Sequence, residues 1–573
     1  MLASRYTICA VVRALSLVSY RLSLAPWISH CCCLAPLRMA VNLAVPYHVV
    51  AAGHSQTAAA AEAILRDGGN AFDAAVAAMA TACVVEPVLA SLGGGGFVLA
   101  CPANGRPRVY DFFVNTPLQC LPQADLDFHP TLADFGTQTQ EFHIGRGSIA
   151  TPGFVAGAFA LQRELGRMTM RDLLSPAVNL AKQGHRVTQF QAYLFNVVKP
   201  IFLATPECAA IFASANANAS ANSDCELVRE GELLRQELLG DFLENLALEG
   251  EALFYRGEVA AALQRDHVNG GQLSRADLEC YTVHTREPLK LKVAGVQVLT
   301  NPPPSSGGTL CAFGLSLLDA ATLQAMGADD VHYQLAIADI LQATHEARIE
   351  AIAANRATDR AAAANASRRN VLDPALLSRY RHEVMGRLHA RRGTTHISII
   401  DAEGNLASVT VSNGEGSGYV VPGTGIVMNN MLGEADLNPG GFQRWVPGQR
   451  MTSMMMPSAV RWADGTQVAC GSGGSNRIRS ALLQVLLRMV VHGDTPQAAV
   501  LAPRLHVEDE LLSVEGGFDN EAMAPLLAAW PQHQLWESRN LFFGGAHTVR
   551  SGPNACDGIG DPRRGGVFVR IPA

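Results

Sequence analysis

The chain has 573 residues, 17% of them charged, and a formal net charge of −7. No basic stripe runs through it, which excludes an electrostatic nucleic-acid surface, so we expect no nucleic-acid partner. A chain of this length easily buries an ordinary hydrophobic core.

Residues 1–38 differ in composition from the rest. Arg13 and Arg21 interrupt the apolar runs, so no stretch reaches the ~20 apolar residues of a membrane span, and no stable span is expected. We expect a disordered or mis-assigned leader and an ordered protein from Met39. The thirteen cysteines have no regular disulfide or zinc spacing, which favours the cytoplasm. The alternative is a periplasmic or secreted protein, if the leader is a degenerate export signal.

The first predicted elements are a strand and two helices. The strand covers 48–53, and helical spacing covers 56–67 and ends at two glycines. A second helix over 71–86 begins after Asn70, a favourable cap. The stretch "SLGGGGFVLA" (91–100) then indicates close backbone packing or a tight turn before a strand. It lacks the Gly-Lys-Ser/Thr of a phosphate loop.

Three later segments are expected to be loops or weakly packed. "NPPPSSGGTL" (301–310) predicts a loop that leads into a helix at 311–325. Residues 213–224 are low in complexity and predict a surface loop. Residues 357–370 are helix-prone or mobile, which places a weakly packed segment upstream of Thr394.

A β-hairpin is predicted around the turn cluster "DAEGN" (401–405). If these five residues separate strands at 394–400 and 406–412, the register places Thr394 directly opposite Ser412. Side chains alternate between the two faces of a strand. One predicted face is rich in hydroxyls: Thr394, His396, Ser398, Ser408, Thr410 and Ser412. The other is mainly apolar: Thr395, Ile397, Ile399, Ala407, Val409 and Val411.

Thr394 has two interpretations at this point. A threonine hydroxyl needs an adjacent base to act as a nucleophile, and an N-terminal threonine supplies its own α-amine. That role requires cleavage between Gly393 and Thr394, where glycine suits a strained backbone. Alternatively, the hairpin is a solvent-facing strand edge with ordinary Ser and Thr pairs, which are common in strands.

A resemblance favours the nucleophile. "TTHISIIDAEGN" resembles the start of the small subunit of γ-glutamyltranspeptidases, which are N-terminal-nucleophile hydrolases. Other segments match in the same order, from about residue 47 to the C-terminus: "GGNAFDAAVAA", "VVEPVLASLGGGGF", "PPPSSGG", "GTGIVMNNML", "GSGGSNRI" and "DPRRGG". Agreement among many spaced motifs is highly specific.

The resemblance implies an α+β fold, the four-layer αββα sandwich. It also implies a chain that cuts itself before Thr394. Residues 39–393 would form the large piece and residues 394–573 the small piece, both in one globular unit that persists as a heterodimer.

The resemblance also assigns the catalytic residues. Thr394 matches the nucleophile, and Ser412 falls where the family keeps a second hydroxyl. Gly473 and Gly474 match the oxyanion hole, where glycine lets backbone N–H groups approach the reacting carbonyl. The same glycine stretch, after a predicted strand at 466–470, lacks the third glycine of a dinucleotide loop. We expect Asn476 to cap the helix that follows.

Three substrate-binding residues follow from the resemblance. Thr452 and Ser453 match a serine pair that holds the α-carboxylate of the substrate, and Glu434 matches an acid that binds its α-ammonium. Without the motif, Glu434 would be an ordinary surface charge. Met454–Met456 are expected to be packing residues.

The sequence departs from the family in the part that recognises the glutamyl group. Phe113 stands where an arginine usually pairs with the substrate carboxylate, a contact of about 1.5–3 kcal/mol. Met431 replaces a Gln or Glu, and Gly414 replaces an Asn. The segment 435–451 is shorter than the usual lid.

We therefore expect a γ-glutamyl transferase or hydrolase that cleaves amides such as glutathione through an acyl-threonine intermediate. It should need no metal or organic cofactor. A glutaryl-type amidohydrolase, similar to a cephalosporin acylase, is the alternative that Phe113 motivates. A processed but inactive scaffold is the alternative of another class. A nucleotide-binding enzyme lacks the required lysine and third glycine.

Overall fold

The computed structural model describes residues 47–134, 139–214, 226–317, 320–359, 394–438, 441–508, 510–519 and 521–573. The predicted leader, Gly393 and most of the segments 213–224 and 357–370 lie outside the described residues. The described residues form one compact unit.

Two stacked sheets form the centre of this unit. The first has the strand order β22-β1-β11-β12-β2-β3-β8, and the second has the order β21-β20-β16-β15-β10-β9. The strands of the first sheet are β1 (Tyr47–Ala52), β2 (Gly95–Cys101), β3 (Arg108–Phe112), β8 (His284–Arg286), β11 (Thr395–Ile400), β12 (Leu406–Ser412) and β22 (Val567–Pro572). Those of the second are β9 (Leu289–Val293), β10 (Val296–Thr300), β15 (Ser458–Arg461), β16 (Gln467–Gly473), β20 (Gly545–Gly552) and β21 (Ala555–Ile559).

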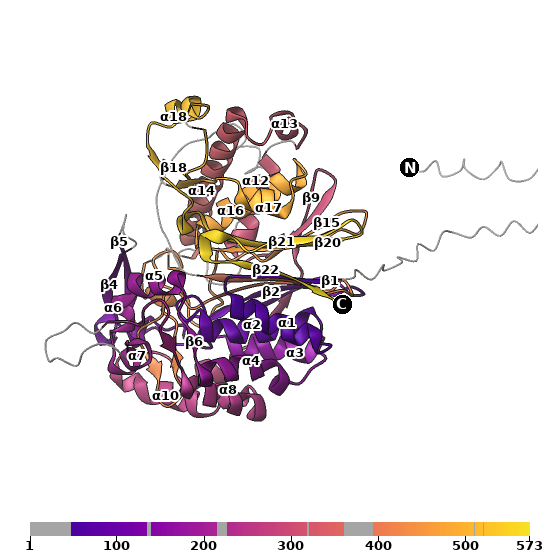
Figure 1. Cartoon of the computed structure of the whole chain (residues 1–573). Helices are drawn as coiled ribbons and strands as arrows, with labels where there is room; N and C mark the ends of the chain where they lie inside the picture. The colour runs from indigo at the N-terminus through magenta and orange to yellow at the C-terminus, as the bar shows by residue number, and fades with distance from the viewer. Residues whose placement is uncertain are drawn as a thin grey trace, which may run out of the picture. The chain divides into compact units, whose positions relative to one another are not determined.

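Helices cover the outer face of each sheet (Figure 1). The first sheet packs on α1 (Ser55–Arg66), α2 (Ala71–Val85) and α3 (Phe154–Leu165). Behind these, α4 (Met170–Gln183) packs on α2, and α8 (Glu237–Glu249) packs on α4. The second sheet packs on α12 (Ser306–Leu317), α16 (Arg477–Val490) and α17 (Pro496–Leu501), and α14 (Val331–Asp359) packs on α12. This is the predicted αββα sandwich of the α+β class.

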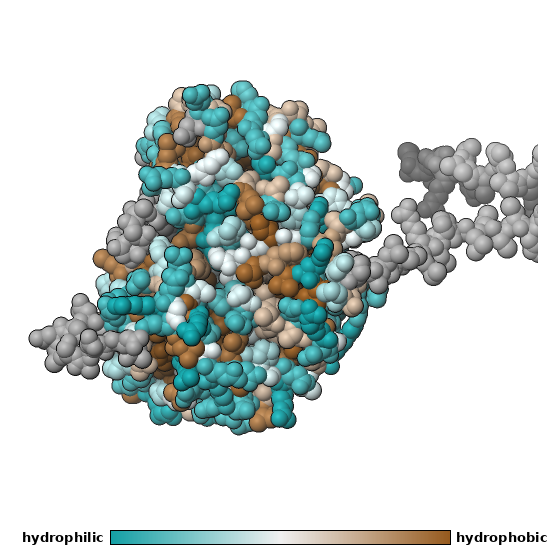
Figure 2. Space-filling view, viewed as in Figure 1, coloured by the Kyte–Doolittle hydropathy of each residue, from teal (hydrophilic) through white to brown (hydrophobic). Residues whose placement is uncertain are grey.

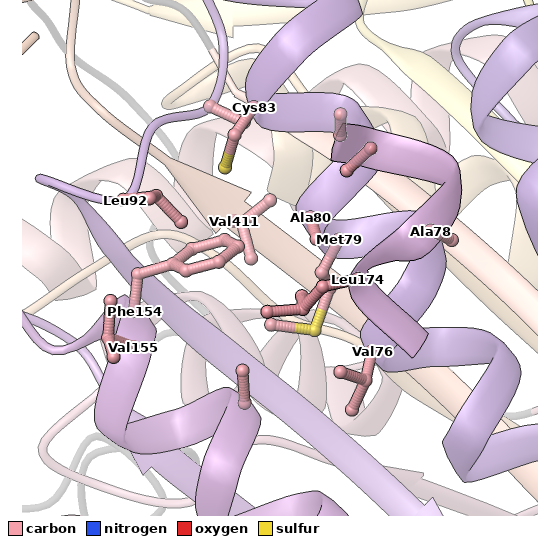
Figure 3. Packing of buried hydrophobic residues seen from close by; sticks show 14 of the residues in the cluster. Val76, Ala78, Met79, Ala80, Cys83, Leu92, Phe154, Val155, Leu174 and Val411 are labelled. Atoms are coloured by element: carbon pink, nitrogen blue, oxygen red, sulfur yellow. The ribbon is translucent and has the colours of Figure 1, made fainter. Parts of the chain in front are cut away.

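The helix α2 lies in the core beneath the central strands. Asn70 caps it, because its side chain accepts hydrogen bonds from the N–H groups of Phe72 and Asp73, as the sequence predicted. Every residue of α2 is buried, which agrees with a helix that is apolar except at Asp73 and Thr81. Figure 3 shows Val411 of β12 pointing toward Phe154 of α3 within this core.

The four glycines 93–96, of which the last two belong to β2, provide close backbone packing. A Cβ on Gly94 would lie 2.3 Å from the carbonyl oxygen of Ser412, and one on Gly96 would lie 2.4 Å from that of Thr410. No side chain fits at such separations, so the glycines let β2 approach β12 closely.

The prediction for the helix after the proline loop was wrong in its bounds. The helix α12 begins at Ser306, inside the Pro/Gly-rich stretch, and a separate α13 covers Ala320–Ala325. A Cβ on Gly307 would lie 2.0 Å from the Met454 carbonyl oxygen. Glycine is therefore required there by packing of the first helical turn and does not mark a loop.

The described helices include none that is long and apolar enough to cross a membrane. On the face shown in Figure 2, hydrophobic residues are interspersed with hydrophilic ones.

Candidate active site

The predicted hairpin forms in the predicted register. The strands β11 and β12 pair antiparallel from Thr395 opposite Val411 to Ile400 opposite Leu406. Thr394 directly precedes β11, and Ser412 is the last residue of β12. Both are buried, with 4% and 6% of their surface exposed. The nucleophile candidate therefore lies inside the molecule, at the end of a central strand.

The hydroxyl-rich face of the hairpin lies against the second sheet and not against solvent. His396 Nδ1 is 2.8 Å from Thr410 Oγ1, and His396 Nε2 is 2.9 Å from Ser398 Oγ. Ser398 Oγ donates to the carbonyl oxygen of His547 in β20 at 3.1 Å. The interpretation as a solvent-facing strand edge is therefore wrong.

This buried polar layer should make the protein sensitive to acid. Burial holds the pKa of His396 well below its usual value and lowers that of His547 to about 4. Below pH 6.5 the unfolded chain therefore binds protons that the folded protein does not accept until about pH 4. Stability should fall as pH falls through that window, by about 1.4 kcal/mol per pH unit for each histidine.

Urea unfolding at several pH values measures this slope. The variant His547→Gln should reduce the slope, and the exposed control His332→Gln should leave it unchanged. An unchanged slope in His547→Gln would show that His547 does not contribute.

The predicted oxyanion glycines lie beside Thr394. A Cβ on Gly473 would lie 2.0 Å from the Thr394 carbonyl oxygen, so the two backbones are in direct contact. Gly474 has φ +122°, a conformation that side chains rarely adopt. The strand β16 extends through Gly473, so the predicted strand at 466–470 was too short. The glycine pair therefore lies at the end of a strand and not in a separate loop.

Asn476 precedes α16 as predicted, but its side chain does not cap the helix. Its Nδ2 donates to Asp436 Oδ2 at 3.1 Å and to Glu508 Oε1 at 2.7 Å. It therefore ties the turn after the glycines to two acidic side chains, and the predicted capping role was wrong.

Ser412 begins a turn that leads toward Glu434. Its Oγ accepts a hydrogen bond from the N–H of Gly414 at 3.1 Å. A Cβ on Gly414 would lie 2.2 Å from Asn430 Oδ1 and 2.3 Å from Glu434 Oε1. The glycine that stands here in place of the family asparagine therefore leaves room for the Glu434 side chain, which is 3% exposed.

Replacement of Ser412 should affect turnover more than folding. The Ser412→Ala variant loses the Oγ that holds the N–H of Gly414 beside Glu434. We expect a rate loss of at least tenfold, about 1.4 kcal/mol of transition-state stabilisation, with normal maturation. Steady-state kinetics and an intact mass measure the two effects. Ser417→Ala, another buried serine of this segment, is the matched control. Unchanged activity in Ser412→Ala would contradict the role.

Thr452 and Ser453 lie against the proline loop. Thr452 Oγ1 donates to the Pro304 carbonyl oxygen at 2.9 Å, and Ser453 Oγ accepts from the N–H of Met455 at 3.1 Å. The N–H of Ser306 donates to the Ser453 carbonyl oxygen. The loop and the pair thus form one packed unit. Met454–Met456 are buried in the core, as predicted.

Phe113 is part of the core. It is 1% exposed and stacks on Phe97 with ring centroids 5.6 Å apart. The nearby Arg450 donates to the Phe113 carbonyl oxygen, and its Nε lies 3.2 Å from Asp111 Oδ1. Since Asp111 already pairs with it, Arg450 is not a free replacement for the family arginine.

Arg564 is a site residue that reasoning from the sequence missed. Its Nη1 donates to the Thr394 carbonyl oxygen at 3.4 Å, and a Cβ on Gly474 would lie 3.1 Å from its Nη2. Burial lowers the pKa of this guanidinium to about 10. The motif "DPRRGG" contains Arg564 and was the available signal, but it was read only as a family match.

Two stacked sheets between helical layers, with a buried threonine at the start of a central strand, define the fold of N-terminal-nucleophile hydrolases. The chain belongs to the gamma-glutamyltranspeptidase family, whose family model matches residues 57–571.

Individual relatives have different names. An acylase ACY 1 proenzyme from Pseudomonas sp. (strain V22) is 30% identical over 523 residues, covering 88% of this chain and 90% of the relative. The glutathione hydrolase proenzyme of Escherichia coli (strain K12) is 29% identical over 535 residues, covering 87% of each. The crystal structure of a cephalosporin acylase from Bacillus halodurans matches with a TM-score of 0.76 and 23% identity over 92% of this chain and 96% of its own, a likeness of fold.

Proposed function

We propose that the protein is a self-processing amidohydrolase that transfers the acyl group of a γ-glutamyl amide to water or to an amine. The observation that carries the proposal is the contact between the Thr394 backbone and Gly473 at the end of β16. It supports a role for the backbone N–H groups of the glycine pair as donors near Thr394, and acyl transfer requires such donors beside the nucleophile.

The reaction begins when Thr394 Oγ attacks the amide carbonyl carbon. The α-amine of Thr394, freed by cleavage after Gly393, takes the hydroxyl proton. The N–H groups of Gly473 and Gly474 donate to the oxyanion. The C–N bond then breaks, the proton passes to the leaving amine, and an acyl-Thr394 ester remains. Water or a second amine attacks this ester, releases the acyl group and restores the hydroxyl.

Cleavage before Thr394 would leave two interleaved pieces. In the first sheet, β1 and β2 from the large piece flank β11 and β12 from the small piece. The strand β1 pairs with β11, and β2 pairs with β12. Backbone hydrogen bonds between these strands would therefore hold both pieces in one heterodimer. The names of two relatives include "proenzyme", which also supports maturation by cleavage.

Glu434 supports a substrate with an α-ammonium group. Its carboxylate is buried beside Gly414, which is two residues after Ser412. A buried carboxylate favours a cationic partner. Thr452 and Ser453 would contact the rest of the glutamyl group. Phe113 favours the second candidate, a glutaryl-type amidohydrolase, because its buried ring offers no charge to a substrate carboxylate.

A pair of anilides separates the two candidates. We expect turnover of a γ-glutamyl anilide with a high KM. The chain lacks the family arginine that would bind the substrate carboxylate equally in the ground state and the transition state, and loss of such binding raises KM but leaves kcat largely unchanged. In Glu434→Gln the KM for this substrate should rise by about tenfold or more, since a charged hydrogen bond contributes about 1.5–3 kcal/mol. The KM for a matched glutaryl anilide, which lacks the α-amine, should change little.

The exposed Glu521→Gln is the control and should behave as the unmodified protein. A preference of the unmodified protein for the glutaryl anilide would assign it as an acylase. Turnover of neither anilide would favour the inactive scaffold.

A further inference from the structure

The turn between β16 and α16 has a strained backbone. It comprises residues 473–476 and contains Gly473 and Gly474, the predicted oxyanion donors. Ser475, which follows them, has φ +51°, in the left-handed region that residues with a Cβ rarely adopt. Such a conformation persists only where the surrounding structure holds it in place. The side-chain contacts of this turn therefore have to supply that support.

The side chain of Asn476 supplies most of it. Asn476 is completely buried, and its Nδ2 donates to Asp436 Oδ2 at 3.1 Å and to Glu508 Oε1 at 2.7 Å. Ionised carboxylates only accept hydrogen bonds, so the amide nitrogen and not the amide oxygen has to face them. Ser475 Oγ donates to the same Asp436 oxygen at 3.4 Å. One amide group thus joins the turn to two carboxylates from different parts of the chain.

Asp436 is an anchor whose position does not depend on the turn. It lies between Glu434 and Asn438, and Asn438 closes this segment with its own contacts. The Nδ2 of Asn438 donates to three carbonyl oxygens within residues 431–434, at 3.0, 3.1 and 2.9 Å. The segment that contains Glu434 should therefore keep its shape when Asn476 is changed.

Glu508 is the second anchor. It ends β17 (Leu505–Glu508), which pairs with β18 (Leu511–Val514). Its Oε2 lies 3.2 Å from His506 Nε2, and His506 Nδ1 lies 2.8 Å from Ser480 Oγ in α16. Burial opposes ionisation of Glu508, but the hydrogen bond from His506 and the nearby arginines outweigh burial and lower the pKa of this carboxyl. Glu508 is therefore an ionised acceptor at neutral pH.

We propose that Asn476 is a positioning residue: by holding this turn between two fixed carboxylates, it aims the N–H groups of the glycine pair at the reacting carbonyl. The role of those N–H groups rests on the proposed function. Oxyanion donors stabilise a transition state only within hydrogen-bond distance of the developing charge, so a small displacement of the turn lowers kcat. Binding of the substrate ammonium depends on Glu434, whose segment has its own contacts, so KM should change little.

The variant Asn476→Asp tests the proposal, because it keeps the shape of the side chain and replaces the donor by a carboxylate. Three carboxylates would then meet, and their repulsion would raise the pKa of the new carboxyl. At about pH 8 we expect kcat for the γ-glutamyl anilide to fall by about tenfold or more, with KM nearly unchanged. As the pH falls, the new carboxyl takes up a proton and can donate again. The kcat of the variant relative to that of the unmodified protein should therefore rise, which a side chain that merely fills space would not cause.

The variant Asn405→Asp is the matched control. Asn405 is also buried, and its Nδ2 donates to Asp401 Oδ2 at 2.8 Å, but it lies in the turn at the other end of the hairpin. It should leave kcat and its pH dependence as in the unmodified protein. Asp436→Ala, at a half-buried residue, removes one anchor without altering Asn476 and should also lower kcat.

Hydrogen exchange gives a readout that needs no turnover. The amides of residues 473–476 should exchange faster in Asn476→Asp and in Asp436→Ala, and those of residues 431–434 should not. Thermal unfolding shows whether each variant is folded, and Asp436→Ala decides if Asn476→Asp is not. Unchanged exchange in the turn, or a relative kcat of folded Asn476→Asp that does not vary with pH, would overturn the positioning role. An unmodified protein that cleaves neither anilide would instead overturn the proposed function, and the exchange result alone would then decide whether Asn476 holds the turn.

Discussion

The variant Thr394→Ala should remain a single chain and should have no measurable amidase activity. The alanine lacks the hydroxyl that would attack the preceding carbonyl during maturation and the substrate carbonyl during turnover. The loss should exceed that of any other single substitution in the site, because no step of the acyl-transfer route remains. Intact mass spectrometry separates one chain from two and gives the cleavage position. It also shows whether residues 1–38 are present.

The neighbouring threonine provides the matched control. Thr395 lies on the opposite face of β11 and donates to Glu86, so Thr395→Ser keeps the hydroxyl and should mature normally. A Thr394→Ala protein that is still cut between Gly393 and residue 394 would refute self-processing. Cleavage of the unmodified chain at any other peptide bond would refute Thr394 as the N-terminal nucleophile.

The variant Gly473→Ala should lose activity by about a hundredfold or more, the range seen when an oxyanion donor is removed. Its Cβ would lie 2.0 Å from the Thr394 carbonyl oxygen and 2.9 Å from the carbonyl carbon. Both are backbone atoms, so the methyl group must displace either β16 or Thr394. Maturation should slow as well, because the same N–H would stabilise the oxyanion in both reactions.

Gly327→Ala is the control for a glycine in open space, since a Cβ there meets no atom within 4 Å. It should mature and turn over as the unmodified protein does. Thermal unfolding of both variants shows whether the fold persists. Full activity in a folded Gly473→Ala would mean that the backbone contact does not serve catalysis.

The hairpin was predictable because its information is local. The five-residue turn and the alternation of side chains along each strand together fix the pairing register of the hairpin. That register places Thr394 and Ser412 at the same end of the hairpin. The bounds of α1 and α2 were also predictable from periodicity, the cap at Asn70 and the glycine stop. The family motifs then added the predicted roles of Gly473, Gly474 and Glu434, which periodicity alone does not suggest.

By itself, the sequence determined the first strand and the first two helices, the hairpin with its two faces, and the family. Only the tertiary structure decided what each face contacts. A strand face with Thr394, His396 and Ser398 has the composition of a solvent face, and it is buried because a second sheet supplies partners from β16 and β20. The Arg564 contact with Thr394 joins residues 170 positions apart, and Phe113 became a core residue by stacking on Phe97. Such contacts depend on how sheets and helices stack, and no local pattern in the chain encodes that stacking.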